Sequence, residues 1–235
     1  MKTSPGFTLV EMSIVLIIIG FLIGGMFAPL SMQMNQQKIR DTKKTLETIK
    51  EALMGYAILN DRLPCPAKCY KYKDENSICF GGTFVNKYVG KEDDTDTTFC
   101  EQEGYLPWVD LGVSQYDAWG NIFRYRLDNS YDTSLTSSDT SSGLKIRNIN
   151  SNHLTNETVN SNVIAIIYSC GKNGMPDATN AISGYTGANC SPISLVTKDI
   201  YTQDFYVENE FDDMLVWLPK TILINQLVSA GKWPP

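Results

Sequence analysis

The sequence predicts an α+β fold in which a long N-terminal helix, first apolar and then amphipathic, packs on an antiparallel β-sheet head that carries disulfides. Three observations lead to this prediction. An uncharged apolar run is followed by residues with helical periodicity, later segments have the composition of buried strands, and the six cysteines form an even set. The 235 residues suffice for the helix and one globular head.

The apolar run Met12–Leu30 is 19 residues long and contains no charged side chain. A helix needs ~20 such residues to cross ~30 Å of hydrocarbon, so we predict a transmembrane helix over residues 7–30. Glu11 stands at the head of this run. A carboxylate there costs on the order of a few kcal/mol unless it finds a partner, which makes Glu11 a candidate functional residue. The alternative is a plain anchor whose Glu11 reaches the membrane interface.

Residues 31–59 are predicted to continue the helix in amphipathic form. Their apolar side chains recur at helical spacing, which gives the helix one face to bury. That face consists of Ile39, Leu46, Ile49, Leu53 and Tyr56.

The globular head is predicted to span residues 60–235, because prolines and glycines end the helical periodicity beyond Asn60. Strands are expected in three segments, "NIFRYRL", "NVIAIIYSC" and "DMLVWLP". In the first, alternation predicts that Arg124 and Arg126 face solvent. A closing helix is expected between Pro219 and Gly231.

The cysteines are predicted to form three disulfides, because an exported head meets an oxidising compartment. Zinc is the competing interpretation, but the sequence has no C-x-x-C pair and its single histidine, His153, is remote. Six cysteines allow 15 connectivities, among which we favour Cys170 with Cys190. The set comprises Cys65, Cys69, Cys79, Cys100, Cys170 and Cys190.

The segment "GFTLVE" and the apolar helix after it resemble the class III leader of type IV prepilins and type II secretion pseudopilins. The resemblance implies a pilin-like fold and a leader peptide over residues 1–6. It also implies that a prepilin peptidase cuts after Gly6 and that the new terminal residue, Phe7, is N-methylated. Glu11 falls where the family has its glutamate, so its implied partner is the Phe7 amine of a neighbouring subunit.

A second segment, "YDAWGNIFRYR", is similar to the D-P-W-G-N-P-Y segment of major pseudopilins. It matches at Asp117, Trp119, Gly120 and Asn121, and has Ala118 in place of the proline. The head is longer than in the major pseudopilins and adds the cysteines, which brings a minor or specialised subunit into consideration.

The resemblance implies a structural subunit of a type IV filament, either a type II secretion pseudopilus or a type IV pilus. The alternative is a minor tip pilin that acts as an adhesin or ligand-binding module. A membrane-anchored enzyme would explain only the anchor, and His153 lies in a polar context without a nucleophile motif, so we expect no enzymatic activity.

The expected partners are other pilin or pseudopilin subunits, the prepilin peptidase and an inner-membrane assembly platform. The expected location is a single pass through the inner membrane with the head in the periplasm, and after assembly a filament in the periplasm or at the cell surface. The net charge of −6 argues against nucleic acid as a partner.

No resident cofactor is predicted, with calcium as the one candidate ion. Pseudopilin heads can bind calcium in a C-terminal loop, and Asn173 and Asp177 offer oxygen ligands of the right hardness, as do Asp93, Asp94 and Asp96. None of these residues has the spacing of an EF-hand, and the alternative is an acidic loop in solvent.

Overall fold

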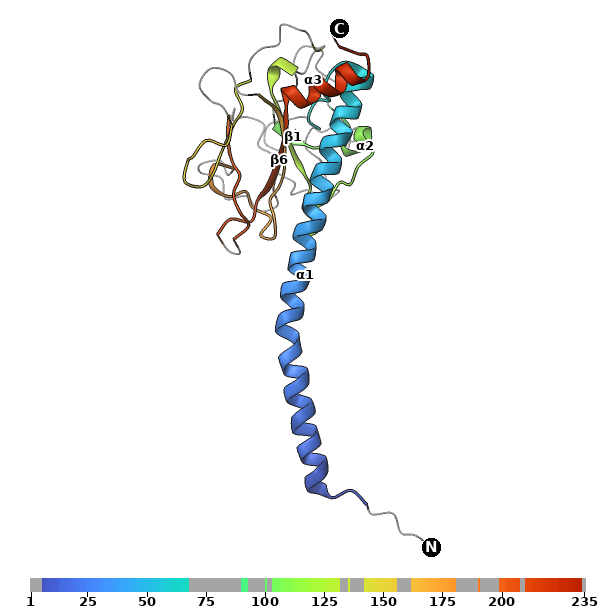
Figure 1. Ribbon diagram of the computed structural model, residues 1–235, viewed down its shortest axis with the longest axis vertical. Helices are drawn as coiled ribbons and strands as arrows, with labels where there is room; N and C mark the ends of the chain where they lie inside the picture. The colour runs from blue at the N-terminus through green and yellow to red at the C-terminus, as the bar shows by residue number, and fades with distance from the viewer. Residues whose placement is uncertain are drawn as a thin grey trace, which may run out of the picture. The chain divides into compact units, whose positions relative to one another are not determined.

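A computed structural model of the chain describes residues 6–67, 90–92, 100, 103–131, 135, 142–155, 162–180, 190, 199–207 and 210–233 (Figure 1). Within this description, the side chains of residues 23–31 and of Asn129 are not included. The chain divides into two compact units, Met1–Arg40 and Asp41–Pro235, which are described separately below.

Helix α1 runs without interruption from Leu9 to Asn60, as the periodicity predicted. In the second unit its buried side chains are spaced at four, three, four and four residues, the stripe of an amphipathic helix. That stripe consists of Thr42, Leu46, Ile49, Leu53 and Ala57. Among the described residues, no helix is both long enough and apolar enough to span a membrane, so the structure does not confirm the transmembrane segment predicted over residues 7–30.

The second unit is built on a four-stranded antiparallel sheet in the order β1-β2-β4-β6. Its strands are β1 (Glu103–Tyr105), β2 (Arg124–Leu127), β4 (Val163–Ser169) and β6 (Met214–Pro219). The three predicted strands are confirmed as β2, β4 and β6. Two helices flank these strands in the chain, α2 (Trp108–Leu111) and the predicted closing helix α3 (Lys220–Ser229).

A smaller parallel pair joins β3 (Lys145–Arg147) to β5 (Ile200–Thr202), with 3₁₀ turns η1 (Asn129–Tyr131) and η2 (Ala178–Asn180) nearby in the chain. Side chains from β3, β4, β5 and β6 form one buried hydrophobic cluster, so the small sheet covers one face of the large one. The cluster comprises Leu144, Ile146, Val163, Ile166, Tyr168, Cys170, Cys190, Tyr201 and Leu215.

The prediction that Arg124 and Arg126 face solvent is wrong, because they are only 2% and 3% exposed. Arg124 lies opposite Tyr168 in the sheet, on the face that the hydrophobic cluster covers. Its guanidinium pairs with the buried Glu103, which also accepts hydrogen bonds from the hydroxyls of Tyr168 (2.7 Å) and Tyr201 (2.5 Å). Burial of this charge therefore depends on a paired and hydrogen-bonded counter-charge.

Two disulfides lie in the described part of the chain. Cys65 bonds Cys100 across 35 residues, and Cys170 bonds Cys190 across 20 residues, with Cα atoms 5.4 and 5.9 Å apart. The second is the pairing favoured from the sequence. Cys69 and Cys79 lie outside the described residues, so the third predicted disulfide stays a prediction.

Candidate functional site

The N-terminal end of α1 is closed by a reciprocal pair of hydrogen bonds between Thr8 and Glu11. The Glu11 carboxylate accepts from the Thr8 N–H and hydroxyl, both at 2.8 Å, and the Thr8 Oγ1 accepts from the Glu11 N–H at 3.2 Å. This is a capping box, in which an N-cap threonine and the glutamate three residues later satisfy each other's backbone donors. Glu11 thus has a partner within its own chain, which the sequence analysis missed although the Thr-x-x-Glu spacing signals it.

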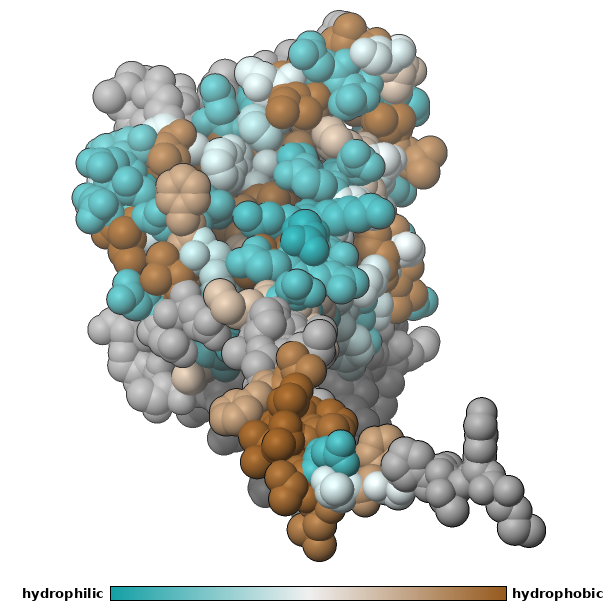
Figure 2. Space-filling model, turned by 60° about the horizontal axis from the view of Figure 1, so that its bottom comes forward, coloured by the Kyte–Doolittle hydropathy of each residue, from teal (hydrophilic) through white to brown (hydrophobic). Residues whose placement is uncertain are grey.

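The helix that follows this cap is apolar on every side within the described chain. Its large hydrophobic side chains from Phe7 to Leu22 are 43% to 87% exposed, and Figure 2 shows brown, hydrophobic side chains gathered on this part of α1. A continuous apolar surface of this kind marks an interaction with a membrane or with other proteins. The residues are Phe7, Leu9, Val10, Met12, Ile14, Val15, Leu16, Ile17, Ile18, Ile19, Phe21 and Leu22.

Gly6 and Phe7, the predicted processing residues, precede the helix and are exposed, with Phe7 84% accessible. No other described group approaches within 4 Å of where a Cβ would stand on Gly6. Both residues that flank the predicted cleavage point are therefore exposed within the described part of the chain, and the cleavage itself stays a prediction.

A second group of charged residues lies in the second unit, where the loop after β4 meets the segment before β6. One carboxylate oxygen from each of Asp177, Asp212 and Asp213 lies within 4.8 Å of the others. Asp212 and Asp213 are 5% and 1% exposed, and their Oδ1 atoms are buried without a hydrogen-bond partner among the described residues. Burial raises the pKa of Asp212 to about 6, aided by Asp177, and that of Asp213 to about 8.

Hydrogen bonds within the two segments hold the three carboxylates together. The Asp177 N–H donates to Asp213 Oδ2 at 2.8 Å, and the Asp212 N–H donates to Asp177 Oδ2 at 2.7 Å. The Asn173 N–H donates to Asp212 Oδ2 at 2.7 Å, and the Asn180 amide donates to Asp213 Oδ2 at 2.9 Å. All four donors are neutral N–H groups, so none of them offsets the charge that these carboxylates carry when they ionise.

The predicted calcium ligands Asn173 and Asp177 are thus only partly brought together by the fold. Asp177 belongs to the carboxylate cluster, but the Asn173 side-chain oxygen accepts from the Met175 N–H at 2.6 Å. Calcium binds six to eight oxygens at ~2.3–2.6 Å, so oxygens across such a site lie up to ~5 Å apart. The carboxylate spacing and the two unpartnered oxygens fit this ion. Asp93, Asp94 and Asp96 lie outside the described residues.

The "DAWGN" segment anchors the same loop to the sheet. The Asp117 carboxylate accepts from the N–H groups of Trp119 (2.9 Å) and Asn121 (2.8 Å), and from the Ser169 hydroxyl at the end of β4 (2.6 Å). The Asn121 amide donates to the Gly171 carbonyl oxygen at 2.6 Å. In this chain the segment therefore builds a turn that positions the acidic loop.

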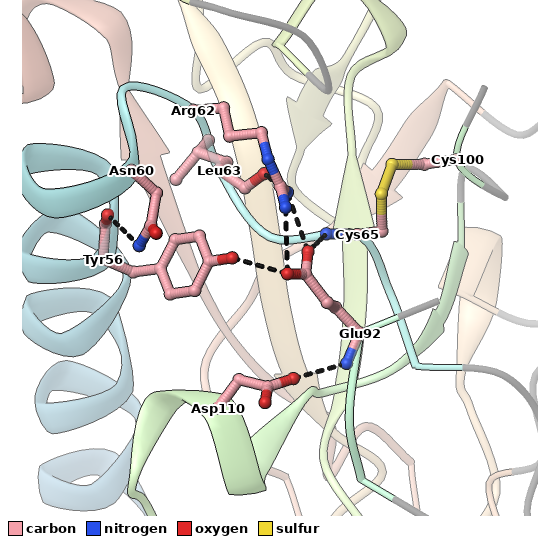
Figure 3. A network of polar contacts seen from close by, with 8 residues as sticks. All are labelled: Tyr56, Asn60, Arg62, Leu63, Cys65, Glu92, Cys100 and Asp110. Atoms are coloured by element: carbon pink, nitrogen blue, oxygen red, sulfur yellow. Dashed lines mark hydrogen bonds and ion pairs between the residues drawn. A yellow bond between two sulfur atoms is a disulfide. The ribbon is translucent and has the colours of Figure 1, made fainter. Parts of the chain in front are cut away.

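A third polar network fastens the end of α1 to the chain around the first disulfide (Figure 3). The Glu92 carboxylate accepts two hydrogen bonds from the Arg62 guanidinium, at 2.7 and 2.9 Å, and one from the Tyr56 hydroxyl at 2.6 Å. It also accepts from the Cys65 N–H at 3.2 Å, while the Glu92 N–H donates to Asp110 Oδ2 at 2.6 Å. Sequence periodicity gives no signal for this network, because 27 or more residues separate Glu92 from the donors to its carboxylate.

His153 is exposed in the described structure and forms an isolated bridge with Arg147. Its exposure agrees with the polar sequence around it.

Comparison with known proteins identifies the first segment. Residues 1–27 match the family model of the prokaryotic N-terminal methylation motif, which is the class III leader of type IV pilins and pseudopilins. No curated protein and no solved structure matches the chain significantly. The resemblance stated from the leader is thereby confirmed, and it supports a pilin-like or pseudopilin subunit.

Proposed function

We propose that the chain is a structural subunit of a type IV filament, a type II secretion pseudopilus or a type IV pilus. Prepilin peptidase removes Met1–Gly6 and methylates Phe7, and the mature subunit is assembled at an inner-membrane platform through its N-terminal helix. The observation that carries this proposal is the methylation motif at residues 1–27, which lies on a helix with exposed apolar side chains.

The exposed apolar surface supports a membrane-inserted precursor whose helix later packs among other subunits. Twelve large hydrophobic side chains are exposed between Phe7 and Leu22, and their transfer from water is favourable by ~25 cal/mol per Å². A bilayer and a bundle of neighbouring helices both provide such cover. We therefore place residues 7–30 in the inner membrane before assembly, with residues 60–235 in the periplasm.

Glu11 has two candidate roles, one within its own chain and one between neighbouring chains. Within one chain it caps α1 through Thr8. Between chains, its charge would neutralise the Phe7 amine of a neighbour, and loss of one buried partner strands the other at roughly 3–5 kcal/mol. Loss of a helix cap costs only ~0.5–2 kcal/mol. We propose that the charge is the property that assembly requires.

Three variants distinguish the charge from the cap. Glu11→Gln removes the charge but keeps a side chain that serves in a capping box, whereas Thr8→Ala removes the capping hydroxyl and keeps the charge. Glu11→Ala removes both. All three are expected to be inserted and processed normally, since Gly6 and Phe7 are unchanged. The two Glu11 variants should remain as processed membrane monomers, and Thr8→Ala should enter filaments.

The measurements are intact-mass spectrometry of the membrane fraction and the yield of sheared filaments. A penalty of 3–5 kcal/mol corresponds to more than ~100-fold in each subunit addition, so the Glu11 variants should give almost no filaments. Normal assembly of Glu11→Gln together with failure of Thr8→Ala would assign Glu11 to capping alone. Retention of Met1–Gly6 in the mature protein would overturn the pilin proposal.

Immunogold electron microscopy of sheared filaments tests the second candidate, a minor tip pilin that acts as an adhesin or ligand-binding module. Labelling along the filament length supports the structural subunit, and labelling confined to one end supports the tip protein. The enlarged head with its disulfides is the feature that favours this alternative.

A further inference from the structure

We propose that Thr42 and Ala118 set the register in which α1 packs on the head, through one hydrogen bond from the Ala118 N–H to the Thr42 hydroxyl. Thr42 is a positioning residue, because it determines which turn of α1 lies opposite the loop that contains Ala118. The consequence for assembly rests on the proposed function. Subunits that pack through their N-terminal helices space their heads evenly only if every head is held at the same height on its helix.

Thr42 is the polar member of the buried stripe of α1, and it is 0% exposed. Its hydroxyl oxygen accepts from the Ala118 N–H at 3.2 Å, across 76 positions of the sequence. The exposed Thr48 instead donates its hydroxyl to the Lys44 carbonyl oxygen of the same helix, at 3.0 Å. Buried polar groups are costly unless they are hydrogen-bonded, so the contact with Ala118 explains how a threonine is accommodated among apolar side chains.

The donor lies in a turn where proline would be the usual residue. The Gly120 N–H donates to the Asp117 carbonyl oxygen at 3.2 Å, which places Ala118 second in a four-residue turn. Proline is favoured at that position because its fixed φ suits the turn, and the similar pseudopilin segment has proline there. Since proline has no N–H, Ala118 supplies a donor that the usual residue lacks.

The turn is itself fixed to the large sheet. The Asp117 carboxylate accepts from the Ser169 hydroxyl at the end of β4, at 2.6 Å. The Asn121 amide donates to the Gly171 carbonyl oxygen, also at 2.6 Å. The Ala118 N–H is therefore presented to α1 at one defined height, and Thr42 is the residue that meets it.

Apolar packing alone leaves the register of α1 open. The buried stripe repeats every three or four residues, so a slide of one helical turn, ~5.4 Å, would again bring apolar side chains to apolar positions. Such a slide would bring Lys38 or Leu46 to the Ala118 N–H, and neither side chain has an acceptor. One polar residue in an apolar helix interface specifies register in the same way in coiled coils.

The test compares Thr42→Val with Thr42→Ser in the full chain, purified in detergent. Valine keeps the shape of threonine and removes the acceptor, whereas serine keeps the acceptor and removes one methyl group. If Thr42 only filled space, serine would be the more damaging change. We expect the reverse order, in which Thr42→Val melts about 2–12 °C below the parent chain and Thr42→Ser melts between the two.

Hydrogen exchange followed by NMR separates this contact from general stability. The Ala118 amide should exchange roughly 5–150-fold faster in Thr42→Val than in the parent chain, and close to the parent rate in Thr42→Ser. The Trp119 and Asn121 amides, which donate to Asp117, should keep their protection in both variants. The matched control is Thr48→Val, the same chemical change at an exposed position of α1, which should leave the Ala118 exchange rate unchanged.

Filament yield, measured where every variant is folded, tests the consequence for assembly. The yield should fall in Thr42→Val and recover in Thr42→Ser. An unchanged Ala118 exchange rate in Thr42→Val, or greater damage from serine than from valine, overturns the positioning role. Normal assembly of a Thr42→Val chain that has lost the hydrogen bond overturns its consequence for filaments. A parent chain that forms no filaments contradicts the proposed function alone, because exchange and melting still decide the role of Thr42.

Discussion

Glu92→Gln is the substitution with the best-defined energetic consequence in the second unit. Each carboxylate oxygen of Glu92 accepts two donors: Oε1 from Arg62 and Tyr56, and Oε2 from Arg62 and the Cys65 N–H. Glutamine replaces one oxygen with an NH₂ group. At the Oε2 position this group would face the N–H donors of Arg62 and Cys65, and at the Oε1 position it would face Arg62 and the Tyr56 hydroxyl, which can turn to accept. The substitution therefore removes one or two hydrogen bonds and the negative charge opposite Arg62.

Hydrogen bonds to charged groups contribute about 1.5–3 kcal/mol each, so the loss of one or two of them costs roughly 1.5–6 kcal/mol. The Arg62 side chain is 30% exposed and can be rehydrated, while the Glu92 side chain is 17% exposed. Because of this rehydration we expect a destabilisation of ~2–4 kcal/mol, or a fall in melting temperature of about 5–15 °C for a chain of this size.

Thermal unfolding of the full chain in detergent, followed by circular dichroism, measures this change. Glu51→Gln is the matched control, because Glu51 is exposed on α1 and undergoes the same chemical change. If Glu92→Gln has the same melting temperature as the control and the parent chain, the network does not stabilise the fold. The reasoning from its hydrogen bonds is then refuted.

Three further predictions concern the second unit. Burial alone would raise the pKa of Glu92, but its hydrogen bonds, led by that from Arg62, lower it. The stabilisation that Glu92 provides is therefore lost as pH falls below the pKa of the unfolded state. The difference in melting temperature between the parent chain and Glu92→Gln should close below about pH 4. Gly171→Ala should cost roughly 3 kcal/mol or more in chemical unfolding, against ~1–2 kcal/mol for Gly231→Ala, which has φ +70° and open space. The oxidised chain should show no titratable thiol, and reduction should lower its melting temperature, since a bridge across 20 residues contributes ~3 kcal/mol.

The long helix and the three strands β2, β4 and β6 are predictable because their signals are local. Helix α1 shows a regular apolar stripe over several turns, and β4 is a seven-residue run of mostly apolar side chains. By contrast, β1, β3 and β5 have three residues each, which is too few to display a period of two.

The burial of Arg124 shows where local alternation fails. Its strand alternates charged and apolar residues, which is typical of a sheet with one face in solvent. The face bearing Arg124 is instead covered by β3 and β5, which follow later in the chain. The Arg124 charge can be buried there because it pairs with the Glu103 carboxylate. The hydroxyls of Tyr168 and Tyr201 donate hydrogen bonds to that carboxylate. The residues that make this burial possible are spread over almost a hundred positions of the sequence, from Glu103 to Tyr201.

The acidic cluster is hidden from sequence patterns for the same reason. Asp177 and Asp212 are 35 residues apart, and nothing in their local context marks them as neighbours. Resemblance to pseudopilins draws attention to the loop containing Asn173 and Asp177. The adjacent acids Asp212 and Asp213 come close to Asp177 because β4 pairs with β6, which brings the end of the first strand to the beginning of the second.

The capping box at the start of α1 is compatible with a charge pair between subunits, because the two interactions use different parts of Glu11. Both hydrogen bonds from Thr8 end on Oε2, so Oε1 keeps its capacity to accept from a donor on a neighbouring chain. The cap also orients the carboxylate before any neighbour arrives, which reduces the entropy lost when the pair forms. Thr8→Ala should therefore assemble with a reduced yield, a smaller defect than that of Glu11→Gln, since a cap contributes ~0.5–2 kcal/mol and a stranded charge roughly 3–5 kcal/mol. Filament yields measured at equal expression decide this order, and an equal defect in both variants would show that orientation and charge cannot be separated in this way.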